Sequence, residues 1–168
     1  GDFADPKGGF YATSSTSEAL IARPKNMQDN PTPSDNALAL EALQIHSALT
    51  GALPAIGEME SAMGAVSIIA RRHPSFAGHS LAVWATHLAG IKEVALTGLG
   101  DATTEMERLV WDSYRPAVIV AVNRESDSPV PLLAERDATD AATAFVCQRL
   151  MCGLPISDAT DLAAALGL

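Results

Sequence analysis

Aromatic residues are scarce in this sequence, which argues against an all-β fold built on large aromatic and β-branched side chains. Phe, Trp and Tyr make up 5% of the 168 residues, whereas hydrophobic residues as a whole make up 48%. Many of the latter are alanines, which favour closely packed helices. The length suits one domain, or two small ones, with room for a real core.

Long apolar runs are also missing. No stretch approaches the roughly 20 residues that a membrane-spanning helix needs, so we expect no membrane span. Residues 1–6 have neither the basic start nor the apolar stretch of a signal peptide. They also lack an initiator Met, which we interpret as a boundary within a longer chain. Two cysteines are too few for a disulfide scaffold, so we predict a cytoplasmic location.

Basic residues are outnumbered by acidic ones. There are 11 Lys and Arg against 20 Asp and Glu, which gives a formal charge of −9 at pH 7. Such a surface repels phosphate backbones and anionic lipids. We therefore expect neither nucleic acid nor a membrane surface as a partner.

Residues 1–90 are expected to form a helical domain behind an N-terminal hairpin. A turn at residues 5–9 precedes a short strand at residues 10–13, and residues 17–21 form either a second strand or a turn of helix. Apolar periodicity predicts helices at residues 34–49, 54–73 and 76–88. The apolar faces comprise Leu38, Ala42, Ile45 and Leu49, widened by Leu40 and Leu43, in the first helix; Ile56, Met59, Met63, Val66 and Ala70 in the second; and the inward-facing Leu81, Trp84, Ala85 and Leu88 in the third.

Residues 91–168 are expected to form a small three-stranded α/β subdomain. It begins with one βαβ unit, whose two strands, at residues 92–97 and 117–122, are parallel. The helix between them is capped by Asp101 or Thr103 and ends near residue 114. Residues 123–140 are read as a loop. A third strand covers residues 143–147, and Ser157 or Asp158 caps a final helix that ends near residue 166. The fold class is therefore α+β.

Several weak motifs have ordinary explanations. Gly98 and Gly100 follow a strand and precede a helix, but the third glycine of a dinucleotide fingerprint is Thr103 here. Cys147 and Cys152 have too few partners for a metal site, and we interpret them as buried structural thiols, with a redox pair as the alternative. The four histidines, His46, His73, His79 and His87, are scattered and read as core or surface residues. We predict no metal and no cofactor, and no catalytic residue can be assigned.

The loop at residues 23–36 is the strongest candidate for a site. It concentrates polar side chains among three prolines and leads into the first long helix. A guanidinium, amides and carboxylates at a helix N-terminus suit a polar, hydroxyl-rich ligand. The alternative is that Asp29, Ser34 and Asp35 only cap and turn, and that Arg23 pairs with a carboxylate. The candidate ligand-binding residues are Arg23, Asp29, Asn30, Ser34 and Asn36.

A family resemblance rests on two blocks of sequence. The first comprises Gly8-Gly9-Phe10-Tyr11, Arg23-Pro24-Lys25, Asp29-Asn30, Pro33-Ser34-Asp35-Asn36 and Leu49-Thr50-Gly51; the second comprises residues 143–147, Cys152, Pro155-Ile156 and Asp158. In both, the chain resembles the C-terminal region of the thioredoxin-domain family that includes YyaL and spermatogenesis-associated protein 20. It departs from the family at Asn26, Asp35 and Ala37, where Asp, Gly and Ser are usual.

The resemblance implies a thioredoxin-like domain, absent from these residues, followed by an α/α toroid similar to six-hairpin glycosidases. Residues 1–90 would then supply the closing helices of the toroid, and residues 91–168 an appended α/β part. The five candidate residues would line or support the toroid cavity. The implied partner is the rest of the full-length chain.

Three functions remain open. The first is a C-terminal fragment of a thioredoxin-domain/toroid protein, non-catalytic alone, that contributes to a carbohydrate-like small-molecule pocket. The second is a small independent sugar-processing enzyme, and the third is a protein-interaction module. A partial toroid would leave apolar helix faces uncovered and would tend to form homodimers.

Overall fold

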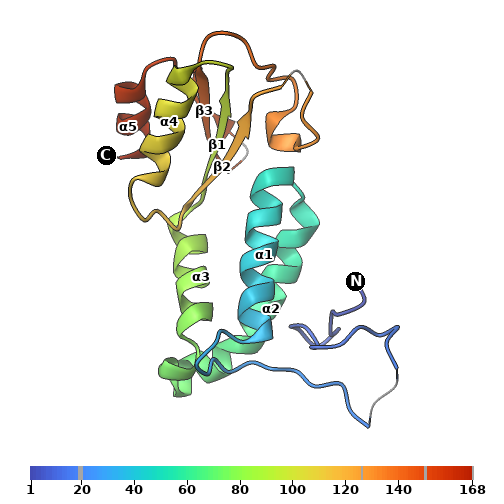
Figure 1. The fold of residues 1–168 in the computed structure, drawn as a ribbon. Helices are drawn as coiled ribbons and strands as arrows, with labels where there is room; N and C mark the ends of the chain where they lie inside the picture. Colours follow the sequence, from blue (N-terminus) through green and yellow to red (C-terminus); the bar gives the residue numbers. More distant parts are fainter. Residues whose placement is uncertain (19–20, 126, 150, 168) are drawn as a thin grey trace. The chain divides into compact units, whose positions relative to one another are not determined.

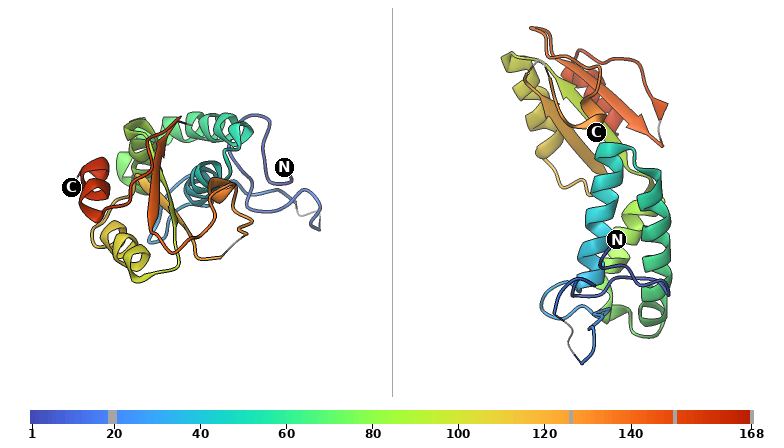
Figure 2. Two further views of the ribbon diagram at one scale, coloured as in Figure 1. Left: turned by 90° about the horizontal axis from the view of Figure 1, so that it is seen from above. Right: turned by 90° about the vertical axis from the view of Figure 1, so that its right-hand side faces the viewer.

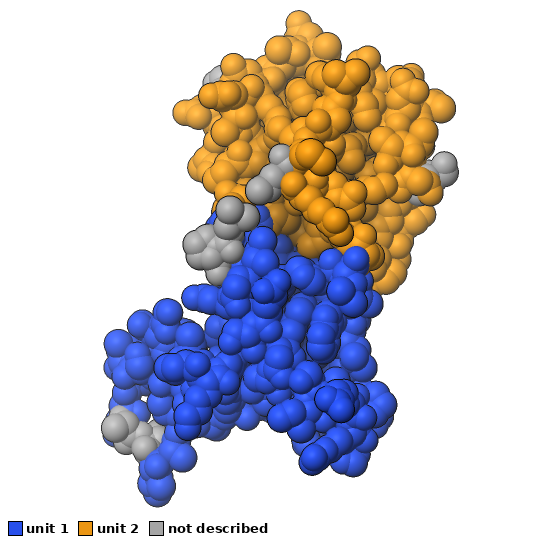
Figure 3. Space-filling view, turned by 180° about the vertical axis from the view of Figure 1, so that it is seen from behind, with its two compact units in different colours: residues 1–47, 52–88 blue, residues 48–51, 89–168 orange. Residues whose placement is uncertain are grey.

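The computed structural model describes residues 1–18, 21–125, 127–149 and 151–167 and divides the chain into two compact units (Figure 3). Unit 1 comprises residues 1–47 and 52–88, and unit 2 comprises residues 48–51 and 89–168. Across the described residues the fold is α+β, with five α-helices and a four-stranded mixed sheet (Figure 1). None of the helices in these residues is both long and apolar enough to cross a membrane.

Unit 1 is built on three helices: α1 (Asp35–Thr50), α2 (Leu53–Arg72) and α3 (Gly78–Ala89). α1 begins where Ser34 Oγ accepts a hydrogen bond from the backbone N–H of Ala37, at 3.2 Å, and it ends at Gly51, which has a φ of 68°. α2 ends before Pro74, with Arg71 and Arg72 in its last turn. These boundaries confirm the three predicted helices, although Pro74–Phe76 is a separate 3₁₀ turn.

The core of unit 1 lies between the three helices, which run side by side (Figure 2). Its buried residues are Leu40, Met59, Ala62, Met63, Val66, Ala77 and Val83. Met59, Met63 and Val66 confirm the stripe predicted for α2. The predicted inward face of α3 is confirmed at Trp84, which packs against the core, and is wrong elsewhere. Leu81, Ala85 and Leu88 are exposed, while Ser80 and Val83 are buried. Periodicity located that helix but did not determine how it is rotated about its axis.

The N-terminal segment contains no regular strand in its described part. A single antiparallel bridge joins Ala4 to Phe10, so the predicted strand at residues 10–13 is wrong. Beyond Phe10, Ala12 donates to the carbonyl of Pro24, and no strand ladder forms there. The strand or helical turn predicted at residues 17–21 falls partly on residues 19–20, which lie outside the described residues.

Unit 2 contains a mixed sheet with the strand order β2-β1-β3-β4. β1 (Lys92–Thr97) is parallel to β2 (Val118–Asn123), as the βαβ pattern predicted, and antiparallel to β3 (Thr143–Gln148). The fourth strand, β4 (Met151–Cys152), pairs with β3. The prediction of three strands missed β4, because two residues are too few to show alternation.

Helices cover one face of this sheet and a short turn covers the other (Figure 1). α4 (Asp101–Trp111) and α5 (Ala159–Leu166) pack on Val94 and Leu96 of β1, while Leu133 of the 3₁₀ turn Pro131–Leu133 packs on Ala95 and Ala121. Asp158 caps α5 as predicted. For α4, by contrast, the N-cap is Gly100, and the helix ends at Trp111 and not near residue 114.

Cys147 and Cys152 form a disulfide, so their interpretation as buried structural thiols is wrong. The two residues lie directly opposite each other in the β3–β4 hairpin. Because the sequence did not reveal β4, it gave no reason to place the two sulfurs side by side.

Candidate functional site

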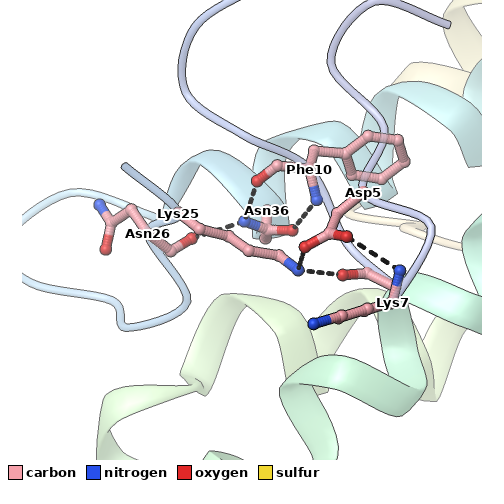
Figure 4. Close-up of polar contacts among 7 residues, drawn as sticks. Asp5, Lys7, Phe10, Lys25, Asn26 and Asn36 are labelled. Atoms are coloured by element: carbon pink, nitrogen blue, oxygen red, sulfur yellow. Dashed lines mark hydrogen bonds and ion pairs between the residues drawn. The ribbon is translucent and has the colours of Figure 1, made fainter. Parts of the chain in front are cut away.

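Asn36 lies in the first turn of α1 and joins three segments of unit 1. Its side chain is fully buried. Its Oδ1 accepts a hydrogen bond from the backbone N–H of Phe10 at 2.7 Å, and its Nδ2 donates to the carbonyls of Phe10 and Asn26 at 2.9 and 2.7 Å (Figure 4). One buried amide thus fixes the N-terminal segment and the polar loop against the start of α1.

A partly buried ion pair between Lys25 and Asp5 closes the turn that precedes Phe10. Lys25 Nζ lies 2.8 Å from Asp5 Oδ2 and also donates to the carbonyl of Gly8, while Asp5 Oδ1 accepts from the backbone N–H of Lys7 at 2.9 Å (Figure 4). The hydrogen bond from Lys25, followed by that from Lys7, lowers the pKa of Asp5 to about 2.

Gly8 and Gly9 permit this close approach. Their φ angles are 99° and 76°, a region in which residues with side chains are strained. A Cβ on Gly9 would lie 2.7 Å from Asn36 Oδ1, and one on Gly8 would lie 2.9 Å from the carbonyl oxygen of Ser61 on α2. The Gly-Gly pair is therefore required by local packing as well as by backbone conformation.

Arg23 is bonded to the N-terminal segment. Its Nη2 donates to the carbonyls of Thr13 and Asp2 at 2.6 and 2.9 Å. Its guanidinium carbon lies 4.1 Å from the centre of the Tyr11 ring, within cation–π distance. Arg23 thereby holds Tyr11 in place from one side.

Asp29 connects the starts of two helices. Its Oδ1 accepts from the backbone N–H of Ser34, at 2.9 Å, and its Oδ2 accepts from the backbone N–H of His79, at 2.7 Å, in the first turn of α3. Ser34 is itself buried as the cap of α1. Asn30 is exposed, and its backbone N–H donates to Thr32.

The five residues predicted as ligand-binding thus have different surroundings. Asp29 and Ser34 are in direct contact, while Asn36 and Arg23 each hold a different part of the N-terminal segment. The alternative left open by the sequence accounts for Asp29 and Ser34, which cap and turn. Its pairing of Arg23 with a carboxylate is wrong, because the guanidinium donates to two backbone carbonyls instead. We call Asp5, Arg23, Lys25, Asp29 and Asn36 the polar clasp.

An open pocket lies beside the polar clasp, between the N-terminal segment and α1. It has a volume of about 600 Å³. Phe3, Phe10 and Tyr11 contribute aromatic rings to its lining. The opposite wall is formed by one face of α1 with one residue of α2: Asp35, Leu38, Ala39, Ala42, Leu43, His46 and Glu58.

The polar clasp positions the walls of this pocket. Asn36 fixes the backbone of Phe10, and Arg23 stacks on Tyr11, so both rings are held by residues that themselves stand outside the pocket lining. Asp35, which precedes Asn36, belongs to the lining. The residues singled out in the sequence therefore support the site, and their neighbours form it.

Sequence reasoning missed the lining residues, although a signal was present. Asp35, Leu38, Ala42 and His46 recur at helical spacing on one face of α1, and Leu38 is 48% exposed. The predicted apolar stripe of α1 is wrong at Leu38, Ala42 and Ile45, which are exposed. The buried face of α1 instead carries Ala37, Leu40 and Gln44, beside Asn36.

The remaining motifs are accounted for by packing. A Cβ on Gly98 would lie 2.3 Å from Thr103 Oγ1, so this turn needs glycine without any nucleotide. His79 Nε2 lies 3.0 Å from Glu41 Oε2. Within the described ranges, no group of three or more His, Cys, Asp or Glu residues could hold a metal ion.

Replacing Asn36 with Ala should destabilise unit 1 by roughly 2–4 kcal/mol, because three hydrogen bonds from a buried amide are lost and the partly buried backbone groups of Phe10 and Asn26 lose these partners. Urea unfolding in a Trp111→Phe background would report on unit 1 through Trp84. The matched control is Asn30→Ala, at an exposed amide. Equal losses from the two substitutions would contradict the role of Asn36.

The lowered pKa of Asp5 predicts a pH-dependent contribution to stability. Because the folded-state pKa lies below the unfolded value, the stabilisation is present above about pH 4 and is lost as the pH falls towards 2. Asp5→Asn should therefore lower the urea midpoint at pH 6, and the difference from wild type should disappear near pH 2. Asp2→Asn serves as the control, and a difference that stayed constant over this range would rule out the ion pair as the cause.

A scan against protein-family models and searches of curated proteins and of solved structures found no match for this chain. We therefore infer a function from the pocket and the contacts around it.

Proposed function

We propose that unit 1 binds a carbohydrate-like small molecule, without catalysing its conversion, in the pocket between the N-terminal segment and α1. The observation that carries the proposal is the composition of the lining. Three aromatic rings share a pocket of about 600 Å³ with Asp35, His46 and Glu58. This volume is within the range of about 300–1,000 Å³ that is typical of small-molecule sites.

The chemistry of the lining suits a ligand that has both an apolar face and hydroxyl groups. Aromatic rings supply large apolar contact areas, and a sugar ring presents C–H groups on its faces. Carboxylates accept hydrogen bonds from hydroxyl groups, and an imidazole can donate or accept them. Asp35 and Glu58 come from different helices, so a bound ring could be contacted from two sides.

The resemblance to the thioredoxin-domain family supports the same proposal. Its implied α/α toroid places a polar small-molecule cavity at the loop before a long helix, and here the pocket adjoins the loop at residues 23–36 and the start of α1. In this reading the three helices of unit 1 are part of the toroid, and the rest of the full-length chain completes the cavity.

A second candidate is an interaction module, which the exposed apolar residues of α1 and α2 favour. Ile45 of α1 and Ile68 of α2 are 41% and 61% exposed, and neither lines the pocket. An apolar surface of this kind is typical of protein contacts. The partner would be the remainder of a longer chain or a second copy of this one.

Sugar binding should raise the melting temperature of the protein. At a ligand concentration 100 times the Kd, the stabilisation is about 2.7 kcal/mol, or several degrees for a small unit. A thermal-shift screen of monosaccharides and disaccharides should reveal at least one such rise, and Glu58→Gln should abolish it. Glu60→Gln, two residues along α2 and outside the lining, should leave it intact.

The absence of any shift across the panel would contradict sugar binding. Chromatography of the same mixtures would detect converted sugar, and conversion that depends on Glu58 would favour the alternative of a sugar-processing enzyme. Acid–base cleavage of that kind requires a pair of carboxyl groups that flank the bond.

Self-association would test the interaction module. Sedimentation of the isolated chain should show a monomer–dimer equilibrium, and the double substitution Ile45→Glu/Ile68→Glu should shift it to monomer, because charges resist burial. Leu99→Glu, at an exposed residue of unit 2, is the control. A wild-type chain that stays monomeric at all concentrations would remove the homodimer as an explanation for these residues.

A further inference from the structure

We propose that the Cys147–Cys152 disulfide is a thiol–disulfide exchange site for a dithiol reductant, with Arg136 placed to stabilise the thiolates that form. This inference concerns unit 2 and is independent of the pocket in unit 1. It rests on the location of the disulfide, the accessibility of one sulfur and the cation beside both.

The location of the disulfide implies that it contributes little to the stability of unit 2. It joins residues separated by 5 in sequence, and their strands β3 and β4 are already paired at this position. A cross-link that closes so short a loop removes little entropy from the unfolded chain. The core of unit 2 is formed by β1, β3, α4 and α5 and does not depend on β4.

The two sulfurs differ in accessibility. Cys147 is 3% exposed, although the next residue, Gln148 at the end of β3, is exposed. Cys152 is exposed, and so are its neighbours Met151 and Gly153. An incoming thiolate therefore reaches the sulfur of Cys152, and Cys147 becomes the leaving group.

Arg136 supplies a fixed positive charge at both sulfurs. Its Nη2 lies 3.4 Å from Cys152 Sγ and 3.9 Å from Cys147 Sγ. Its Nη1 donates to the carbonyl of Leu132, and its guanidinium carbon lies 4.8 Å from the centre of the Phe145 ring, so the side chain is held in this orientation.

Among the residues that the structure describes, no ion pair neutralises the charge of Arg136. In the ranges that the structure describes, salt bridges join Lys25 to Asp5, His79 to Glu41 and Arg124 to Glu107, and none of them includes Arg136. A neighbouring arginine favours a thiolate over a thiol, and a more stable thiolate leaves a disulfide faster.

The reaction balances as two exchanges. A thiolate of the dithiol attacks Cys152 Sγ, the bond between the two cysteines breaks, and Cys147 leaves as a thiolate. The second thiolate of the reagent then attacks the reagent sulfur of the mixed disulfide and releases Cys152 as a thiolate. The protein gains two electrons and the dithiol becomes a cyclic or intramolecular disulfide.

The rate of reduction by dithiothreitol tests the proposal on the oxidised full chain at pH 7, with acid quenching and thiol labelling as the readout. Arg136→Gln should slow reduction by about tenfold, and Arg136→Lys should recover most of the rate because it restores the charge. Arg124→Gln removes the same charge from the surface of unit 2 and should stay within about twofold of wild type. Equal rates in all four proteins would overturn the proposal.

Two further measurements separate exchange from a structural role. In the reduced protein, the midpoint of the alkylation-versus-pH curve should rise by about one pH unit in Arg136→Gln. The double variant Cys147→Ser/Cys152→Ser should remain folded, with a melting temperature close to that of wild type. An unchanged midpoint, or a double variant that does not fold, would contradict an exchange site, and neither result bears on sugar binding in unit 1.

Discussion

The hydrogen bonds between the Asn36 amide and the backbone of Phe10 are the constraint on which unit 1 depends. Among its described residues the N-terminal segment forms one isolated bridge, between Ala4 and Phe10, and no regular strand. Its other backbone hydrogen bonds, such as Tyr11 N–H to the carbonyl of Phe3, lie mostly within the segment, whereas those of Asn36 attach it to α1. The buried Asn36 amide bonds to both the N–H and the C=O of Phe10, as the backbone of a neighbouring strand would, although no strand lies there. Because Phe10 also lines the pocket, the same bonds connect the start of α1 to the shape of the candidate site.

The rest of the polar clasp extends this constraint in two directions. Lys25 and Asp5 close the glycine turn before Phe10, and Arg23 fixes Tyr11 after it. Asp29 bonds to backbone N–H groups at the starts of α1 and α3, where the helix dipoles favour a negative charge. Polar residues that appeared to form one recognition loop therefore fix different parts of the unit through bonds within the chain, although Arg23 Nε is buried without a partner among the described residues. Their proximity in sequence reflects a loop that touches many parts of the unit in succession.

Local patterns predicted most helices and strands, and failed where a feature depends on distant contacts. The ends of α1 follow from Ser34 and Gly51, and the parallel pairing of β1 with β2 follows from the βαβ order. The rotation of α3 could not be read from its sequence, because Val83 and Leu81 are equally apolar and only packing against α1 and α2 selects Val83. β4 is too short to give a pattern, and because it was not predicted, the disulfide between β3 and β4 was not predicted either. The pocket was missed for a similar reason: Leu38 and Ala42 look like core residues until the path of the N-terminal segment is known.

The lining of the pocket itself favours a polar ligand over a covering segment of apolar protein. Asp35 and Glu58 are exposed, and an apolar helix laid over Leu38 and Ala42 would remove water from both carboxylates without providing donors. Burial of an unpaired carboxylate is strongly unfavourable, whereas a hydroxyl-rich ligand supplies the donors that such groups require. Ile45 and Ile68 do not line the pocket and can be covered by protein without that penalty. The two candidate functions thus use different residues of α1 and α2, and a larger helical assembly could contain both.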